Sequence, residues 1–181
     1  SPNGNIPVHA FNLISPTFFA NSSTGNKYSL WVNVYGVSER YLNVYGEKDL
    51  RAQMNQFFHR TYTHPVDGTT LDMKMLCNWY WYDETAILET GKGTKDWNFY
   101  RYAETLLSAA EAIAQSSGVN AEAAGYLAQV KARANMEGKD ASTIASELQR
   151  LGKQAFIEEC WKERLREFPL ETVSYTHLRA H

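Results

Sequence analysis

The sequence predicts a mostly α fold, in which a scaffold of stacked helix pairs carries long, irregular, aromatic-rich loops. Apolar residues recur at helical spacing through residues 98–171. Residues 1–97 instead hold many turn residues and most of the aromatic side chains, with little sustained periodicity. Irregular stretches of this length are unusual in a complete compact domain. We therefore expect a fragment of a larger domain, in which the irregular region, residues 1–97, forms ligand-binding insertions on a helical body.

Two helices are predicted first in the helical half. The first spans about residues 97–115, and Gly118 is suited to end it because glycine readily adopts the left-handed conformation at a helix C-terminus. Asn120 can cap the next helix by accepting from free backbone N–H groups. The alanines of that second helix permit close approach of a neighbour. The two apolar stripes are Phe99, Ala103, Leu106, Leu107, Ala110, Ile113 and Ala114, then Ala123, Leu127, Val130 and Ala134.

A third helical region is predicted after a break at residues 137–140. Ser146 and Gln149 have the spacing of a capping box, in which Gln149 reaches back to the Ser146 N–H. Pro169 ends the last helix. The apolar stripe of that helix is Ile157, Trp161, Leu165 and Phe168. Antiparallel helices joined by a short turn form the unit of tetratricopeptide-like solenoids, so we predict that architecture.

Three segments of the first half have local signals. Residues 28–37 are rich in β-branched and aromatic side chains and form either a short strand or an extended loop. Residues 50–62 have helical propensity, with Met54 and Phe57 spaced as on one helix face, so a short helix is expected there. Residues 64–68 (HPVDG) are expected to form a turn.

The composition argues against several classes of function. A net charge of −2 gives no basic stripe for a nucleic-acid partner, and no apolar run has the length of a membrane span. Cys77 and Cys160 form neither a disulfide framework nor a Cys-x-x-Cys metal pattern, so we expect inert thiols, with a single bridge between them left open. The loop histidines His59 and His64 lack a metal-ligand spacing. We expect no metal and no cofactor.

Residues 173–181 (VSYTHLRAH) resemble the translation of a DNA adapter left by transposase-based sequencing libraries. The first two bases of that adapter would also complete the codon of Thr172. We therefore interpret residues 172–181 as an adapter-derived tail and expect the natural sequence to stop near Glu171. His177 and His181 have the i, i+4 spacing of two metal ligands on a helix, but the adapter interpretation is favoured over a zinc site.

Motifs in the helical half resemble those of the SusD/RagB family. Residues 99–112 (FYRYAETLLSAAEA) resemble the family helix RYAE…LL..AEA, and VKARA at 130–134 resembles its V(R/K)AR segment. Residues 163–171 (ERLREFPLE) are similar to the start of the signature ER..E…EG.RW.DL, and KDLR at 48–51 resembles a D.R segment. The resemblance is strong over residues 98–171 and looser over 46–97, and it does not extend to residues 1–45.

The resemblance implies a binding protein and not an enzyme. Members of this family capture oligosaccharides, or peptides in some relatives, as a lid over a SusC-like TonB-dependent transporter. We therefore expect a surface-exposed outer-membrane protein with a glycan or peptide ligand and a SusC-like partner. It would meet the membrane only through a lipid anchor, which we expect this fragment to lack. The alternative is an independent helical-repeat module that binds a protein, which explains the helices but not the motifs. A glycoside hydrolase fragment is a third possibility.

Aromatic side chains are the candidates for contact with a glycan. Trp79, Tyr80, Trp81 and Tyr82 form a dense run, and Trp31 is a further candidate. Aromatic rings stack on the C–H faces of sugars at little cost in side-chain ordering. Alternate residues of an extended run point in opposite directions. Either Trp79 and Trp81 or Tyr80 and Tyr82 would then face solvent, while the other pair fills the core. The alternative is that the whole run packs in the core.

Charged residues of the helices are expected to be structural and not catalytic. The pairs considered are Arg101 with Glu104, Glu163 with Glu167, and Arg164 with Arg166. As helix neighbours, such residues contribute a few tenths of a kcal/mol per pair. A catalytic acid or base would need a perturbed carboxyl group facing a cleft. The sequence therefore predicts no catalytic residue.

Overall fold

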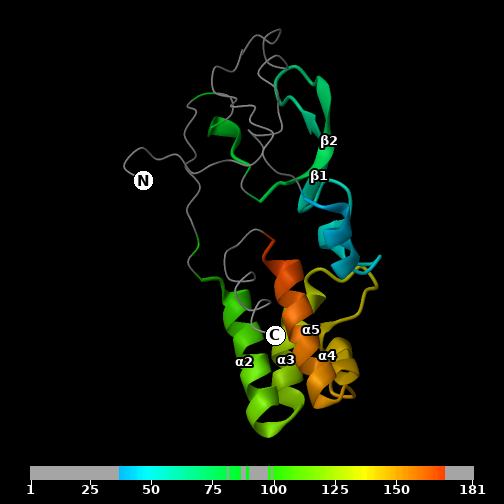
Figure 1. The fold of residues 1–181 in the computed structure, drawn as a ribbon, viewed down its shortest axis with the longest axis vertical. Helices are drawn as coiled ribbons and strands as arrows, with labels where there is room; N and C mark the ends of the chain where they lie inside the picture. Colours follow the sequence, from blue (N-terminus) through cyan, green and yellow to red (C-terminus); the bar gives the residue numbers. More distant parts are fainter. Residues whose placement is uncertain (1–36, 81, 87–88, 90–97, 99, 170–181) are drawn as a thin grey trace. The chain divides into compact units, whose positions relative to one another are not determined.

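The computed structural model describes residues 37–80, 82–86, 89, 98 and 100–169. The chain divides into two compact units (Figure 1). The first unit comprises residues 1–43 and 52–97, and the second, the helical unit, comprises residues 44–51 and 98–181.

The described part of the helical unit contains four α-helices, which are labelled in Figure 1. They are α2 (Tyr102–Ser117), α3 (Ala121–Ala132), α4 (Ala141–Leu148) and α5 (Lys153–Glu167). Helix α3 packs against both α2 and α4, while α5 packs against α2. The predicted mostly α fold is confirmed.

Small residues bring α2 and α3 into close contact. These two helices contribute to the core a set of alanines with no exposed surface, namely Ala110, Ala114, Ala123, Ala124 and Ala128. The larger side chains of Leu107, Leu127 and Phe156 are equally inaccessible and fill the space beside them. Each side chain of that size stabilises the fold by about 1.5–3 kcal/mol when it leaves water. This packing agrees with the alanine-rich stripe of the sequence.

The helix ends test the local predictions. Gly118 follows α2 with a φ of 83°, and the Asn120 Oδ1 accepts from the Ala123 N–H at 2.9 Å, as expected. The start of α2 differs, because the described residues before Tyr102 are not helical. Arg101 is extended, with φ −112° and ψ 151°, and its guanidinium binds Glu167 on α5. A tertiary contact therefore sets the start of this helix, where propensity alone predicted an earlier one.

The predicted capping box is wrong. Helix α4 begins after Asp140, whose Oδ1 accepts from the Thr143 N–H at 2.8 Å and from the Ser142 hydroxyl at 2.9 Å. Ser146 lies inside α4, and its hydroxyl donates to the Ser142 carbonyl. The Ser-x-x-Gln spacing does not by itself place a helix start, because Asp140, six residues earlier, already accepts from a free N–H of the first turn.

The buried face of α5 also differs from the predicted stripe. Ile157 and Phe168 are buried as expected, but Trp161 and Leu165 are only half-buried. The core side of the helix instead includes Phe156, Cys160, Glu163, Arg164 and Glu167. Charged side chains are buried here because each carboxylate meets an arginine from another segment, a pairing that hydrophobic periodicity does not detect.

The first unit contains a β-hairpin (Figure 1). Strands β1 (Phe58–Thr63) and β2 (Thr70–Asn78) are antiparallel, with Phe58 opposite Asn78 and Thr63 opposite Thr70. The helix expected over residues 50–62 is therefore wrong, since only the 3-10 turn η3 (Leu50–Ala52) is helical there. A second 3-10 helix, η2 (Glu39–Val44), precedes it. Strand pairing with β2 outweighs the helical propensity of β1.

The turn of this hairpin is the one that the sequence predicts. The His64 N–H donates to the Thr69 carbonyl at 2.8 Å, and Gly68 adopts a φ of 73°. His64 is buried, and its Nδ1 accepts from the backbone N–H groups of Val66 and Asp67. Of residues 28–37, only Val37 is described, and it forms an isolated bridge with Leu76. The prediction of a strand or loop for the rest of that segment lies outside the described residues.

Two substitutions separate the observed helix cap from the predicted one. Asp140→Ala should lower the melting temperature of the helical unit by a few degrees, because the first turn of α4 loses its side-chain acceptor. Ser146→Ala should leave it unchanged, because this hydroxyl binds only a carbonyl already within the helix. Circular dichroism melts of both variants measure the difference. The reverse ranking would contradict the observed start of α4.

Candidate functional site

An aromatic stack lies at the end of β2 in the first unit. The Trp79 ring stacks on the His59 ring, with centroids 4.2 Å apart and an interplanar angle of 11°. It also stacks on the Tyr82 ring at 4.5 Å and 14°. Two rings lying flat this near one centroid would overlap on the same face, so His59 and Tyr82 cover opposite faces of Trp79. The buried Tyr62 packs against Trp79 and Tyr82 at a tilt.

The stack forms because the chain turns directly after β2. The Tyr82 N–H donates to the Trp79 carbonyl at 3.0 Å, and the Asn78 Oδ1 accepts from the Tyr80 N–H at 2.9 Å. The aromatic run is therefore not extended, and the expected alternation of its side chains does not apply. Trp79 and Tyr82, which alternation placed in opposite directions, instead lie together.

This geometry changes which rings are available to a ligand. Both faces of Trp79 are covered, so the outer faces of the stack belong to His59 and Tyr82. All three side chains are half-buried, and Tyr80 is half-buried too. Burial, together with the neighbouring Tyr62, raises the pKa of Tyr82, so its hydroxyl stays neutral. Trp31 and Trp81 lie outside the described residues. Glycan stacking on this run stays a prediction.

The second feature is a group of buried charges in the helical unit, centred on Glu167 at the end of α5. Its carboxylate, 6% exposed, accepts from Arg51 at 3.0 Å, from Arg101 at 2.9 Å and from Arg133 at 2.7 Å. Arg101 also donates to the Glu167 carbonyl at 2.7 Å and lies over the Phe168 ring. One carboxylate thus joins three arginines that come from three separate segments of the chain.

Glu163, one turn earlier on α5, forms the other half of this group. It is fully buried and lies 2.8 Å from Arg51, 3.0 Å from Arg166 and 3.8 Å from Lys131. Arg51 also binds both carboxylate oxygens of Asp49, at 2.9 and 2.7 Å. Burial alone would lower the pKa of Arg51, but the hydrogen bond with Asp49 and the charge of Glu163 raise it, so Arg51 stays protonated.

These contacts correct the interpretation of the charged residues as helix neighbours. Two pairs of this group are local in the chain, Glu163 with Arg166 at the helix-neighbour spacing i, i+3 and Arg51 with Asp49 two residues apart. Arg51 and Glu167 are 116 residues apart in the chain, and Arg101 and Glu167 are 66 apart. The KDLR and ER..E segments were recognised as motifs, but their spacing in the chain could not predict that they meet.

A further arginine ties α5 to α2. Arg164 is buried and donates from Nε to Glu104 at 3.2 Å and from Nη2 to the Ser108 hydroxyl at 3.1 Å. It also pairs with Glu111, which accepts from the Trp161 indole N–H. Arg164 therefore contacts α2 and not Arg166, the neighbour with which the sequence grouped it.

Residues 44–51 pack onto the helices through the backbone as well. The Leu50 N–H donates to the Ala134 carbonyl at 2.8 Å, and the Met136 N–H donates to the Lys48 carbonyl at 2.9 Å. The Tyr45 hydroxyl donates to the Arg166 carbonyl at 2.9 Å. A segment far upstream in the chain therefore becomes part of the helical unit, alongside the link between α3 and α4.

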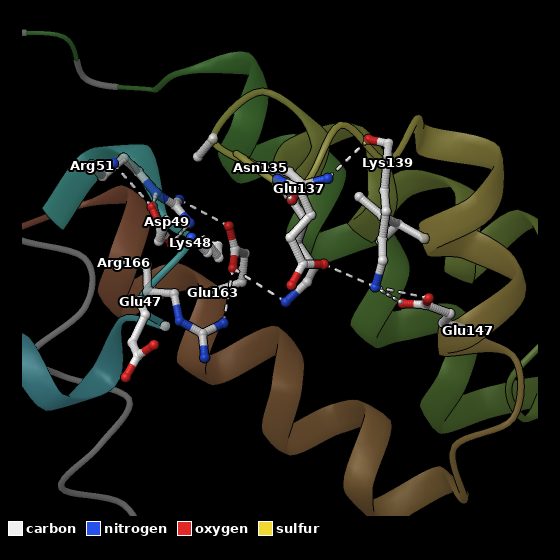
Figure 2. A pocket seen from close by; sticks show the side chains of 14 residues that line it. Glu47, Lys48, Asp49, Arg51, Asn135, Glu137, Lys139, Glu147, Glu163 and Arg166 are labelled. Atoms are coloured by element: carbon white, nitrogen blue, oxygen red, sulfur yellow. Dashed lines mark hydrogen bonds and ion pairs between the residues drawn. The ribbon is translucent and has the colours of Figure 1, made fainter. Parts of the chain in front are cut away.

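A polar pocket of about 380 Å³ lies beside this segment (Figure 2). Its charged lining is balanced, with Glu47, Asp49, Glu137, Glu147 and Glu163 facing Lys48, Arg51, Lys131, Lys139 and Arg166. Figure 2 shows Lys139 between Glu137 and Glu147 at one end, where the ion pairs measure 2.9 and 3.0 Å. Most of these charges already have protein partners, so the pocket could accept a polar, uncharged group but offers no base poised for catalysis.

The pKa of Glu159 is set by burial and by Lys131 and Arg166, which also contact Glu163. Burial opposes its ionisation, but Lys131 and Arg166 outweigh burial and lower its pKa below the usual 4.5. Glu159 lies 2.8 Å from Arg166 and also pairs with Lys131. This carboxylate is therefore ionised at neutral pH and stabilises the fold in that form.

The structure describes both cysteines. Cys77 and Cys160 are free and buried, and burial raises the pKa of each thiol to about 12. Neither is a reactive thiolate at neutral pH. Within the described residues, no group of three or more His, Cys, Asp or Glu side chains is arranged to hold a metal ion. None of the described helices is long and apolar enough to cross a membrane.

Comparison with known proteins gives the family. The model of the SusD family matches residues 20–179, and the chain therefore belongs to that family. The match starts well upstream of the motifs that identified the resemblance. It also extends into residues 172–181, which lie outside the described residues, and their origin in an adapter stays a prediction. No curated protein matches the chain.

A solved structure has a similar fold. It is the crystal structure of a SusD superfamily protein from Parabacteroides distasonis ATCC 8503, with a TM-score of 0.65 and 23% sequence identity. The match covers 89% of this chain and 34% of that chain. The chain thus spans about a third of the length of that protein, and the likeness bears on the fold alone.

Removing the charge at the centre of the buried group should be costly. Glu167→Gln leaves Arg51, Arg101 and Arg133 without their shared counter-charge and should lower the free energy of unfolding by about 3 kcal/mol. Glu158→Gln, on the exposed side of α5, is the matched control and should change it by less than about 0.5 kcal/mol. Urea denaturation followed by circular dichroism measures both. Equal effects would show that the charge on Glu167 is unimportant.

The lowered pKa of Glu159 predicts acid sensitivity. A carboxyl group with a depressed folded-state pKa contributes stability above its unfolded-state pKa and loses it as pH falls through the folded-state value. Glu159→Gln should therefore destabilise the protein at neutral pH, and the difference from wild type should shrink below pH 4.5. Urea midpoints measured from neutral pH down to about pH 3 test this. A difference that stays constant with pH would count against the assignment.

Proposed function

We propose that this protein captures oligosaccharides at the outer surface of the cell and passes them to a SusC-like TonB-dependent transporter in the outer membrane. Membership of the SusD family is the single observation that supports this proposal most strongly. Localisation at the membrane through a lipid anchor and partnership with the transporter are part of the same proposal.

The aromatic stack supports a glycan over a peptide as the ligand. Sugars present flat C–H faces that match aromatic rings, and ring stacking needs few hydrogen bonds to be strong. The covered faces of Trp79 make it a support that holds the Tyr82 ring, while Tyr80 and Tyr82 are the direct contacts we propose. Trp31 and Trp81 remain candidates for the same surface.

The charged residues support binding without chemistry. Glu163, Glu167 and Glu104 are buried in ion pairs with arginines, and Arg51 and Arg164 each bind more than one acceptor. A general acid or base has to reach its substrate and exchange a proton near neutral pH. These carboxylates instead hold helices together, so we propose that the protein is not an enzyme.

Glycan binding by wild type and two variants tests the proposal. Binding should be measured on a glycan array and then by calorimetry on the glycans that bind. Tyr82→Ala should weaken affinity by up to about tenfold, because one stacking face is lost. Val66→Ala, at an exposed position in the hairpin turn, is the control and should bind as wild type does.

Other results would point to the rival functions. Hydrolysis of the bound glycans, lost on replacement of a single carboxylate, would favour a glycoside hydrolase. Absence of binding to every glycan would contradict the proposal and favour a module that binds a protein. Equal affinity of Tyr82→Ala and wild type would leave glycan capture intact but remove the stack from the site.

A further inference from the structure

A second cavity, of about 320 Å³, lies on the helical unit between the start of α2 and the end of α3. Its lining includes the buried side chains of Leu106 and Val130, which provide an apolar base. Tyr102, Gln129 and Arg133 are exposed residues of the same lining. The cavity is of the size that small-molecule sites commonly have, and it combines an apolar surface with a few polar groups.

Tyr102 offers this cavity an accessible aromatic ring. The side chain is 72% exposed, and Tyr100, close by in the chain, is 79% exposed. Unlike Trp79, whose faces are covered by His59 and Tyr82, Tyr102 is largely open to solvent. A rigid ring with an apolar face and a hydroxyl suits the C–H face of a pyranose.

Two arginines of the lining are held in place by one buried carboxylate. Arg101 and Arg133 both donate to Oε1 of Glu167, at 2.9 and 2.7 Å. Arg133 is 58% exposed, and a guanidinium has five N–H donors. Its bond to Glu167 fixes the group while further donors stay available to a ligand. A guanidinium fixed in this way binds with less loss of conformational entropy than a free side chain.

The charge of the cavity differs from that of the polar pocket in Figure 2. Among the residues that the structure describes, its lining contains the two arginines and no carboxylate, whereas the polar pocket has equal numbers of acidic and basic side chains. Glu167 cannot neutralise the cavity fully, because its single negative charge is shared by Arg101 and Arg133. The cavity therefore favours a ligand that carries a negative charge.

We propose that this cavity is a subsite for an acidic sugar, a uronic acid residue of the captured glycan. The carboxylate of this sugar would pair with Arg133, because a planar guanidinium matches the geometry of a carboxylate. Its ring would lie on Tyr102, with Gln129 in reach of hydroxyl groups. This inference rests on the proposed function and names the class of glycan.

The test compares acidic and neutral glycans of the same backbone. Calorimetry on the 181-residue chain would use oligomers of galacturonate, glucuronate and mannuronate, and the same oligomers after reduction of their carboxyl groups. Wild type should bind at least one acidic oligomer more tightly than its neutral counterpart, and added salt should reduce the preference. Arg133→Gln should weaken acidic binding by about tenfold and leave neutral binding unchanged.

Further variants keep the test independent of folding. Gln129→Glu adds a negative charge at an exposed position of the cavity and should also weaken only acidic binding. Tyr102→Ala should weaken both classes, while Tyr102→Phe should keep the affinity because the ring remains. Arg150→Ala, an exposed arginine elsewhere in the helical unit, is the matched control. Circular dichroism melts show whether each variant is folded.

The outcomes separate this inference from the proposed function. Selective loss of acidic binding in Arg133→Gln and Gln129→Glu would support the subsite. Glycan binding with no acidic preference, or with a preference unchanged in both variants, would overturn the subsite and leave glycan capture standing. Absence of binding to all oligomers, acidic and neutral, together with a blank glycan array, would overturn both.

Discussion

The carboxylate of Glu167 is the contact on which the helical unit depends. Removing an ion from water costs several kcal/mol, which only well-placed partners can offset. The partners of Glu167 are Arg51, Arg101 and Arg133, which come from η3, the start of α2 and the end of α3. All three can reach it only if these segments and α5 adopt one arrangement. Hydrophobic burial stabilises the helices, and the need to pair this charge selects how they are joined.

Local signals in the sequence predicted most of the local structure, and the cap of α4 is the exception. The helical half, the end of α2 at Gly118, the cap at Asn120 and the hairpin turn each depend on a few adjacent residues. The start of α2, the hairpin strands and the partners of Glu167 depend on residues distant in the chain. The spacing of Met54 and Phe57 fits a helix, yet strand pairing with β2 decides the structure of the neighbouring segment. A single sequence does not record which distant residues meet, so these contacts cannot be predicted from it.

The candidate sites show the same division. The sequence shows residues 79–82 as an aromatic run, but the turn after Asn78 places Trp79 between His59 and Tyr82, which alternation in a strand could not predict. The cavity beside Tyr102 was missed. Its signal in the sequence is Tyr102 with Arg101 and Arg133, which stand at the ends of two helices. Because residues 99–112 match a family helix motif, they were interpreted as packing residues. The same Glu167 that joins the helices orients the arginines proposed to bind the ligand.

A double-mutant cycle between Arg51 and Glu167 tests the central claim most directly. The unfolding free energies of wild type, Arg51→Gln, Glu167→Gln and the double variant give the coupling between the two side chains. A shared, buried ion pair at 3.0 Å predicts a favourable coupling of about 1–3 kcal/mol. A coupling near zero, with additive losses, would show that the two residues stabilise the protein independently and would contradict the role of Glu167 as the contact that joins the helices.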